Sequence, residues 1–341
     1  MGAAPKVTIA TATYNCLEYT QLFLKSLRNF AKIPYHLIIV DNHSTDGTLE
    51  FLAGQKDVEL IANKRNLGFG YANNQAFART KTPYFLGINN DTFIFPGFFE
   101  NLLSIAEKHR DYGEFGVNSN CIGARNPFTK ELINSGFDQL LSQGHCLAST
   151  IKKYYGNYQQ FFKKFSTVNK GLTTFEVPPN FIGGWCFLVR TKEIRQIGKL
   201  FDTQYKVGFW EDVDLSWRMK KQGYKIGNIN GIYLHHFTHV SFKKNKLRKT
   251  DHAISRANAL LFARKWDEEI KQFLIVKFSQ SISLKKIMND YFIFKVYFGK
   301  RQNYDKLEKL IKTKYLSSKK MCFDKFLLLS ASNKPQAKKK R

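Results

Sequence analysis

Three short segments of the chain carry residue types that could bind a divalent cation or move a proton. The first ends in Asp91, after the amides Asn89 and Asn90. Magnesium and manganese prefer oxygen ligands, and one or two protein ligands suffice where substrate phosphates complete the shell. Asp91 is therefore a candidate metal ligand, although an Asn-Asn-Asp run is also typical of a turn.

The second segment is the acidic pair Glu211-Asp212, which follows Trp210. A carboxylate at the start of a helix, beside an aromatic ring, could be partly desolvated and act as a general base. The alternative is that the acidic residues cap the helix, and for Asp214 we favour a structural pair with Arg218 at i+4.

The third segment contains His235, His236 and His239, directly after a predicted strand. One imidazole could complete a metal shell, and a mixed oxygen and nitrogen site suits manganese better than magnesium. We expect the other two histidines to be structural. The spacing alone does not say which one is the ligand.

The elements around these residues predict an α/β fold. Strand-like runs alternate with helical patterns over the first 90 residues, an order that predicts a mainly parallel, Rossmann-like sheet flanked by helices. Polar residues follow each strand, and strand ends of a parallel sheet share one edge, where ligands bind. The predicted strands are 6–12, 35–40, 58–62 and 83–88; the helices are 17–31, 45–53 and 71–80; the polar strand ends are 11–15, 41–42, 63–70 and 89–91.

The remaining chain is less regular. We expect a domain over residues 1–245, a basic helical region over 246–332 and a disordered basic tail over 333–341. Within the first domain the patterns predict a helix at 96–110, β-hairpins and loops over 113–176, strands at 186–190 and 225–234, and helices starting near Lys192 and Phe209.

Composition restricts the class of protein and its location. Five scattered cysteines show no metal or disulfide spacing, and neither a secretory signal nor a transmembrane run is visible. We therefore expect a cytoplasmic protein. Residues 243–341 carry 27 Lys and Arg against 8 Asp and Glu, which is +19 of the net charge of +27. This region could contact an anionic membrane, because apolar residues alternate with lysines, or it could be a helical cap with a solvated lysine face.

Together, the segments from Val7 to Phe242 resemble the family-2 glycosyltransferases of the GT-A fold, in the family's order. The matching segments are Val7–Asn15, Ile38–Thr48, Asn63–Asn74, Asn89–Thr92, Phe181–Trp185 and Trp210–Asp212, followed by His236. The family's DXD motif has Asn89 at its first position here, a form seen among rhamnosyltransferase-like members. The resemblance does not extend beyond residue 245.

The resemblance implies roles for individual residues. Asp91 and His236 would hold Mn²⁺ or Mg²⁺, and Asp212, next to Glu211, would be the general base of an inverting transfer. Trp185 and Trp210 would contact the sugar or the acceptor. The nucleotide sugar would contact Thr11, Thr13, Asn15, Asp41, Asn66, Gly68, Asn89, Asn90, Gly184 and Trp185. The donor could be dTDP- or UDP-linked, with rhamnose plausible, and the acceptor a glycan, a lipid-linked or a protein-linked hydroxyl in polysaccharide biosynthesis.

Two other functions compete with this interpretation. A nucleotidyltransferase would need a glycine-rich pyrophosphate loop, which Thr11-Ala12-Thr13-Tyr14 does not supply. A non-catalytic protein could instead bind a nucleotide, or nucleic acid through the basic C-terminal region, with aromatic residues stacking on bases. We expect the transferase and no nucleic-acid partner.

Overall fold

The structure is a computed structural model that describes residues 4–119, 180–237, 248–298 and 303–332, with the short stretches 152–153, 156–157, 159–161, 163–164 and 172–174. It divides into two compact units. The first comprises Met1–Phe175 with Ile182–Thr250, and the second Glu176–Phe181 with Asp251–Arg341. The predicted domain boundary after residue 245 lies outside the described residues.

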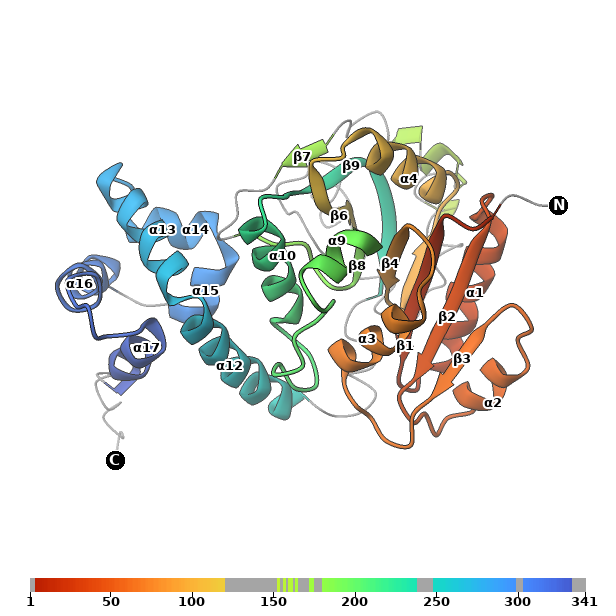
Figure 1. Cartoon of the computed structure of the whole chain (residues 1–341), viewed down its shortest axis with the longest axis horizontal. Helices are drawn as coiled ribbons and strands as arrows, with labels where there is room; N and C mark the ends of the chain where they lie inside the picture. Colours follow the sequence, from red (N-terminus) through yellow and green to blue (C-terminus); the bar gives the residue numbers. More distant parts are fainter. Residues whose placement is uncertain are drawn as a thin grey trace. The chain divides into compact units, whose positions relative to one another are not determined.

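The first unit is built on one sheet (Figure 1), in the strand order β3-β2-β1-β4-β8-β6-β9-β5, with β7 paired to β9. The strands are β1 (Val7–Thr13), β2 (Tyr35–Asp41), β3 (Glu59–Ala62), β4 (Tyr84–Ile88), β5 (Thr92–Ile94), β6 (Tyr112–Asn118), β7 (Leu172–Thr174), β8 (Cys186–Arg190) and β9 (Lys225–His236). The helices are α1 (Leu17–Phe30), α2 (Thr48–Ala53), α3 (Phe69–Arg79), α4 (Phe98–Lys108), α9 (Thr191–Gln196) and α10 (Glu211–Lys221).

The predicted α/β class is confirmed, but half of the sheet is not parallel. β1, β2, β3 and β4 pair in parallel, whereas β8 runs antiparallel to both β4 and β6. The expectation of hairpins after residue 113 is wrong for β6, because β6 pairs in parallel with β9. The rest of the predicted hairpin region lies mostly outside the described residues.

Alternating side chains form two cores on the two faces of the sheet. Ile9 and Leu86 join Phe23 of α1 in one buried hydrophobic cluster. Their neighbours point to the opposite face, where the Phe85 ring lies 5.4 Å from that of Phe77 on α3 and 6.1 Å from that of Phe187. Because successive side chains of a strand point to opposite faces, the position of a polar residue at a strand end determines the face of the sheet on which it lies.

The second unit is helical, as the sequence predicts for the region 246–332. Buried aromatic and aliphatic side chains form its core. The partly buried Asp267 accepts hydrogen bonds from the Tyr315 hydroxyl at 2.9 Å and the Phe323 backbone N–H at 2.5 Å. No helix among the described residues is long and apolar enough to span a bilayer. The elements are α12 (Arg248–Lys265), α13 (Asp267–Ser279), α14 (Leu284–Asp290), α15 (Phe292–Phe298), α16 (Tyr304–Leu310), the π-helix Ile311–Leu316 and α17 (Phe323–Ser332).

Candidate functional site

The carboxyl ends of β1 and β2 are joined by a buried hydrogen-bond cluster around Asp41. This carboxylate accepts from the Thr13 hydroxyl at 3.0 Å, from the Ser44 backbone N–H at 2.9 Å and from the Ser44 hydroxyl at 2.5 Å. Ser44 in turn accepts from the Asn15 backbone N–H at 2.7 Å. The Thr11 hydroxyl donates to the Ile88 carbonyl at 2.8 Å. These side chains hold the strand-end loops in place, and their contact with a nucleotide stays a prediction.

Asn42 connects this cluster to the loop after β3. Its side-chain oxygen accepts from the Asn63 side chain at 2.9 Å, and its amide nitrogen lies 3.4 Å from the Gly68 carbonyl. Within the loop, the Asn66 side chain accepts from the Gly68 N–H at 2.9 Å. These hydrogen bonds hold the loop in place and position Gly68 directly before α3.

Gly68 is in close contact with the loop that precedes α10. Its φ is +86°, and a Cβ at this position would lie 2.7 Å from the Val207 Cα and 2.8 Å from the Val207 carbonyl oxygen. That carbonyl accepts from the Phe69 N–H at 2.8 Å. Val207, Phe209 and Trp210 all have positive φ, at 66°, 73° and 78°. Such backbone strain is rare outside glycine and is characteristic of functional loops.

Asp91 and His236 come together because β5 pairs antiparallel with β9, with Thr92 opposite His236. The Asp91 Oδ1 and His236 Nε2 atoms are 3.1 Å apart, and the residues are only 6% and 8% exposed. The Asn89 side-chain nitrogen lies 3.4 Å from the same His236 Nε2 atom.

The 3.1 Å separation of Asp91 Oδ1 and His236 Nε2 is that of a direct hydrogen bond or ion pair, and it also fits two ligands of one cation. Two ligands at right angles around a cation at about 2.1 Å lie about 3 Å apart. No group of three or more His, Cys, Asp or Glu that could hold a metal is found among the described residues. The pair would therefore need substrate oxygens or water to complete the shell, as magnesium and manganese sites in phosphate-binding enzymes commonly do.

The adjacent residues orient this pair. Trp185 stacks on the His236 ring, with centroids 5.6 Å apart, and its carbonyl accepts from the Asn89 N–H at 2.9 Å. Asn90 turns away and donates to the Thr20 hydroxyl of α1 at 3.0 Å. His235 faces away from His236 along the strand, where burial lowers its pKa to about 3, so it is neutral. The two histidines were expected after the strand, but they form its last two residues. His239 lies outside the described residues.

Asp212 is held by two backbone donors at the start of α10. Its Oδ2 accepts from the Gly184 N–H at 2.9 Å, and its Oδ1 from the Val213 N–H at 2.8 Å. The residue is half-buried. Burial raises the pKa of Asp212, and the hydrogen bonds from Gly184 and Val213 oppose that rise. A partly accessible carboxylate with a raised pKa can accept a proton near neutral pH.

Glu211 and Trp210 are more enclosed than Asp212. Burial, followed by the charge of Asp212, raises the pKa of Glu211 to about 8, so its carboxyl group is mostly protonated at pH 7. Its Oε2 has no hydrogen-bond partner among the described residues. Trp210 is 6% exposed, so little of its ring is open to a sugar. Of the two carboxyl groups, Asp212 is the one suited to accept a proton.

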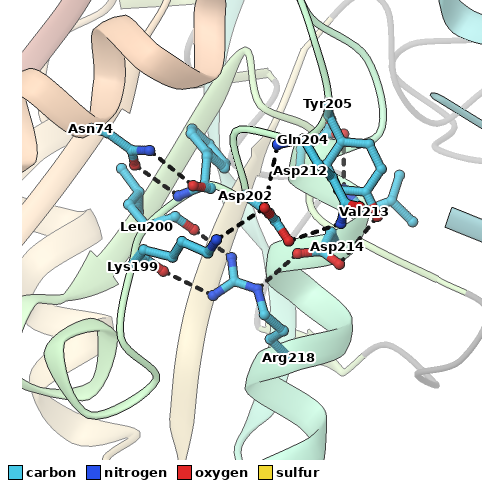
Figure 2. Close-up of polar contacts among 11 residues, drawn as sticks. Asn74, Lys199, Leu200, Asp202, Gln204, Tyr205, Asp212, Val213, Asp214 and Arg218 are labelled. Atoms are coloured by element: carbon cyan, nitrogen blue, oxygen red, sulfur yellow. Dashed lines mark hydrogen bonds and ion pairs between the residues drawn. The ribbon is translucent and has the colours of Figure 1, made fainter. Parts of the chain in front are cut away.

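The predicted structural role of Asp214 is confirmed by its contacts. Its carboxylate is fully buried and lies 2.8 Å from the Arg218 Nε atom, four residues later on α10. Figure 2 shows the other side of this guanidinium donating to the carbonyls of Lys199 and Leu200, at 2.8 and 2.5 Å. The pair thus attaches α10 to the loop that follows α9.

Several residues of the site carry no motif that sequence reasoning could use. Ser44 lies within a matching segment but has no role implied by the resemblance. Val207 contributes through its backbone conformation, which its residue type would not predict. Glu114 and Ser216 form a buried pair at 2.6 Å between β6 and α10, 102 residues apart in sequence.

Comparison with known proteins gives consistent results. The sequence profile described as Glycosyl transferase family 2 matches residues 8–175. The chain is 30% identical over 122 residues to EpsE of Bacillus subtilis (strain 168), named as a glycosyltransferase; the match covers 34% of this chain and 44% of EpsE. It is 25% identical over 252 residues to the N-acetylglucosaminyl-diphospho-decaprenol L-rhamnosyltransferase of Mycobacterium tuberculosis (strain ATCC 25618 / H37Rv), covering 68% of this chain and 76% of that enzyme.

Among solved structures, the crystal structure of TarS from S. aureus is similar in fold, with a TM-score of 0.51 at 15% sequence identity. The similarity covers 87% of this chain but 46% of TarS, so the chain spans less than half of that protein. The fold is that of the GT-A glycosyltransferases, as the sequence predicts. The profile match assigns residues 8–175 to glycosyl transferase family 2, and the similarity to the rhamnosyltransferase relative extends over 252 residues.

Proposed function

We propose that the protein transfers a sugar from a nucleotide diphosphate sugar to an acceptor hydroxyl, with inversion at the anomeric carbon. The observation that carries this proposal is the environment of Asp212. Its carboxylate is oriented by the Gly184 and Val213 backbone N–H groups and is half-buried, which raises its pKa. These are the properties that a general base needs.

In this proposal Asp212 takes the proton of the acceptor hydroxyl as the hydroxyl oxygen attacks C1 of the donor sugar. The bond from C1 to the acceptor oxygen forms, the bond from C1 to the diphosphate oxygen breaks, and a nucleoside diphosphate leaves. Glu211 stays protonated beside Asp212, so the two carboxyl groups do not both carry charge.

The diphosphate end of the donor would lie near Asp91 and His236. A divalent cation held by these two residues would offset the negative charge that develops on the leaving diphosphate. Asn89 and Trp185 orient the imidazole by contacting it from two sides. The loops that contain Asp41 and Gly68 would receive the nucleoside.

The relatives support a choice of donor and acceptor class. The Mycobacterium tuberculosis relative is named for transferring L-rhamnose to N-acetylglucosaminyl-diphospho-decaprenol. We therefore propose a dTDP- or UDP-linked donor, with rhamnose as the first sugar to test, and a glycan or lipid-linked acceptor for this chain.

A lipid-linked acceptor would place the protein at a membrane surface. The second unit carries many lysines together with exposed apolar residues such as Ile275, Val276, Leu328 and Leu329. Such a combination suits peripheral contact with anionic lipids. Binding to vesicles that contain an anionic lipid, but not to neutral vesicles, would support this contact; equal binding to both would contradict it.

The proposed reaction is tested with a panel of dTDP-, UDP- and GDP-sugars in the presence and absence of Mn²⁺. One donor should stabilise the protein against thermal unfolding by about 2.7 kcal/mol at a hundredfold excess over its Kd. With a lipid-diphosphate sugar acceptor, the same donor should give a product whose anomeric configuration, read by NMR, is opposite to that of the donor. Retention of configuration, or binding of RNA but of no nucleotide sugar, would overturn the proposal.

A further inference from the structure

A buried polar chain connects β6, α10 and the segment between Ile182 and Gly184. The Ile182 backbone N–H donates to the Ser216 hydroxyl at 3.0 Å, and that hydroxyl donates to the Glu114 Oε2 at 2.6 Å. Glu114 and Ser216 are both fully buried. Two residues after Ile182, the Gly184 N–H donates to Asp212. One short segment therefore links Glu114 on β6 to Asp212 on α10.

The segment from Ile182 to Gly184, with the adjacent Trp185, is also held by contacts with Asn89 and with β6. The carbonyl of Trp185 accepts from the Asn89 N–H, next to the Asp91 region. A Cβ on Gly116 would lie 3.0 Å from the Ile182 side chain, so the segment packs directly against β6. Displacement of Ile182 would consequently move the donor that orients Asp212.

We propose that Glu114 is a positioning residue for the transfer reaction: through Ser216 it fixes the Ile182–Gly184 segment, and this segment orients the Asp212 carboxylate. The proposal rests on the role of Asp212 as general base. Glu114 itself is enclosed on β6 and does not touch the substrate.

The cost of burying Glu114 supports a role beyond packing. A carboxyl group in a fully buried position is unfavourable unless it is hydrogen-bonded, and an apolar side chain of similar size would commonly be tolerated better. Its Oε1 has no hydrogen-bond partner among the described residues. Burial raises the pKa of Glu114 to about 8, so the group is mostly neutral at pH 7 and serves as a hydrogen-bond acceptor for Ser216.

Two variants of similar size separate hydrogen bonding from packing. Glu114→Gln keeps a carbonyl oxygen that can accept from Ser216, whereas Glu114→Met fills the space without accepting. Ser216→Ala removes the same link from the other side and provides a second test if Glu114→Met does not fold.

The first readout is amide hydrogen exchange of the peptide that contains Ile182 and Gly184, measured without substrate. Loss of the link should speed exchange at these amides about tenfold in Glu114→Met and Ser216→Ala, but by less than about threefold in Glu114→Gln. Because no donor or acceptor is needed, this result is independent of the proposed function.

The second readout uses the donor found in the panel. The kcat for transfer should fall about tenfold in Glu114→Met and Ser216→Ala, while the Kd for the donor nucleotide changes by less than about threefold. Glu114→Gln should retain most of kcat. Unchanged exchange and kcat in folded Glu114→Met or Ser216→Ala, or equal losses in Glu114→Gln and Glu114→Met, would overturn the proposal.

Discussion

The Gly184 backbone N–H donates to the Asp212 Oδ2 atom at 2.9 Å, across 28 residues of sequence. This bond orients the carboxylate in the first turn of α10. Burial raises the pKa of Asp212 and the backbone hydrogen bonds lower it, so their balance sets how readily it accepts a proton. The adjacent Trp185 contacts Asn89 and His236. The candidate base Asp212 and the candidate metal ligand His236 thus contact the same two-residue segment, Gly184–Trp185.

The contact between Gly68 and Val207 predicts a severe effect of a single methyl group. Gly68→Ala adds a Cβ at φ +86°, 2.7 Å from backbone that cannot rotate away. We expect loss of at least about 2 kcal/mol of stability, measured by urea unfolding, because strain and overpacking add. Gly223→Ala is the matched control: its φ is +87°, with nothing within 4 Å of the added Cβ. Equal losses in the two variants would contradict a role for the contact.

The pair Asp91 and His236 predicts metal-dependent nucleotide binding. Asp91→Asn and His236→Ala should each weaken Mn²⁺-dependent binding of the nucleoside diphosphate by at least about tenfold, by analogy with the cost of disturbing metal-site residues. Isothermal titration with and without Mn²⁺ measures this change. His36→Ala, near the amino end of β2, is the control and should bind as the wild type does. Tight, metal-independent binding of the nucleoside diphosphate by the wild type and by both variants would contradict the assignment.

The buried pair of Arg218 and Asp214 should contribute more to stability than a surface pair. Arg218→Met leaves a buried carboxylate and frees two carbonyls, so we expect a loss of roughly 3–5 kcal/mol. Lys225→Met breaks a pair with Asp111 in which both side chains are more than half exposed, and should cost about 0–1 kcal/mol. Chemical unfolding of both variants gives the comparison. Similar losses would show that the Arg218 contacts shown in Figure 2 contribute little.

The raised pKa of Glu114 predicts a pH-dependent stability. Burial is the largest cause and raises the pKa, and the charge of Asp212 raises it further. The hydrogen bond from Ser216 and the charge of Arg218 lower it. Between the ordinary pKa of about 4.3 in the unfolded chain and about 8 in the native state, the native protein keeps a proton that the unfolded chain has lost. This difference lowers stability by about 1.4 kcal/mol per pH unit as pH rises.

Glutamine does not titrate, so Glu114→Gln lacks this pH dependence. The free energy of unfolding of Glu114→Gln should therefore rise relative to that of the wild type as the pH increases from about 5.5 to about 7.5. Urea unfolding at three pH values measures the difference. Glu107→Gln on the exposed surface should show no such gain. Parallel curves for Glu114→Gln and the wild type would contradict the pKa of Glu114.

The first strands could be predicted from the sequence to within about one residue, because they are short apolar, β-rich runs, and β1 and β4 are buried on both faces. The partner of β8 could not be predicted. Cys186–Arg190 inserts antiparallel between β4 and β6, and its paired residues Leu86 and Glu114 lie far from it in sequence. Strand periodicity carries no information on such pairing. Shape decides it, since Phe187 packs where Gly87 has no side chain.

The candidate site shows the same limit. Residue type alone indicated three histidines without choosing one, whereas the pairing of Thr92 with His236 places His236 against Asp91 and turns His235 away. Glu114 was not found, because one acidic residue in the run Tyr112–Asn118 looks like a solvent-facing position of a strand. Only the three-dimensional placement of Ser216 shows that it is enclosed.

The rate of sugar transfer by Asp212→Asn, compared with Glu211→Gln, tests the central claim most directly. Asparagine keeps the size of the side chain but cannot take the acceptor proton, so kcat should fall by a factor of about 10²–10⁴ with donor affinity nearly unchanged. Glu211 is already mostly neutral at pH 7, so Glu211→Gln should lose less than about tenfold. Near wild-type transfer by Asp212→Asn, or a larger loss in Glu211→Gln, would contradict Asp212 as the base.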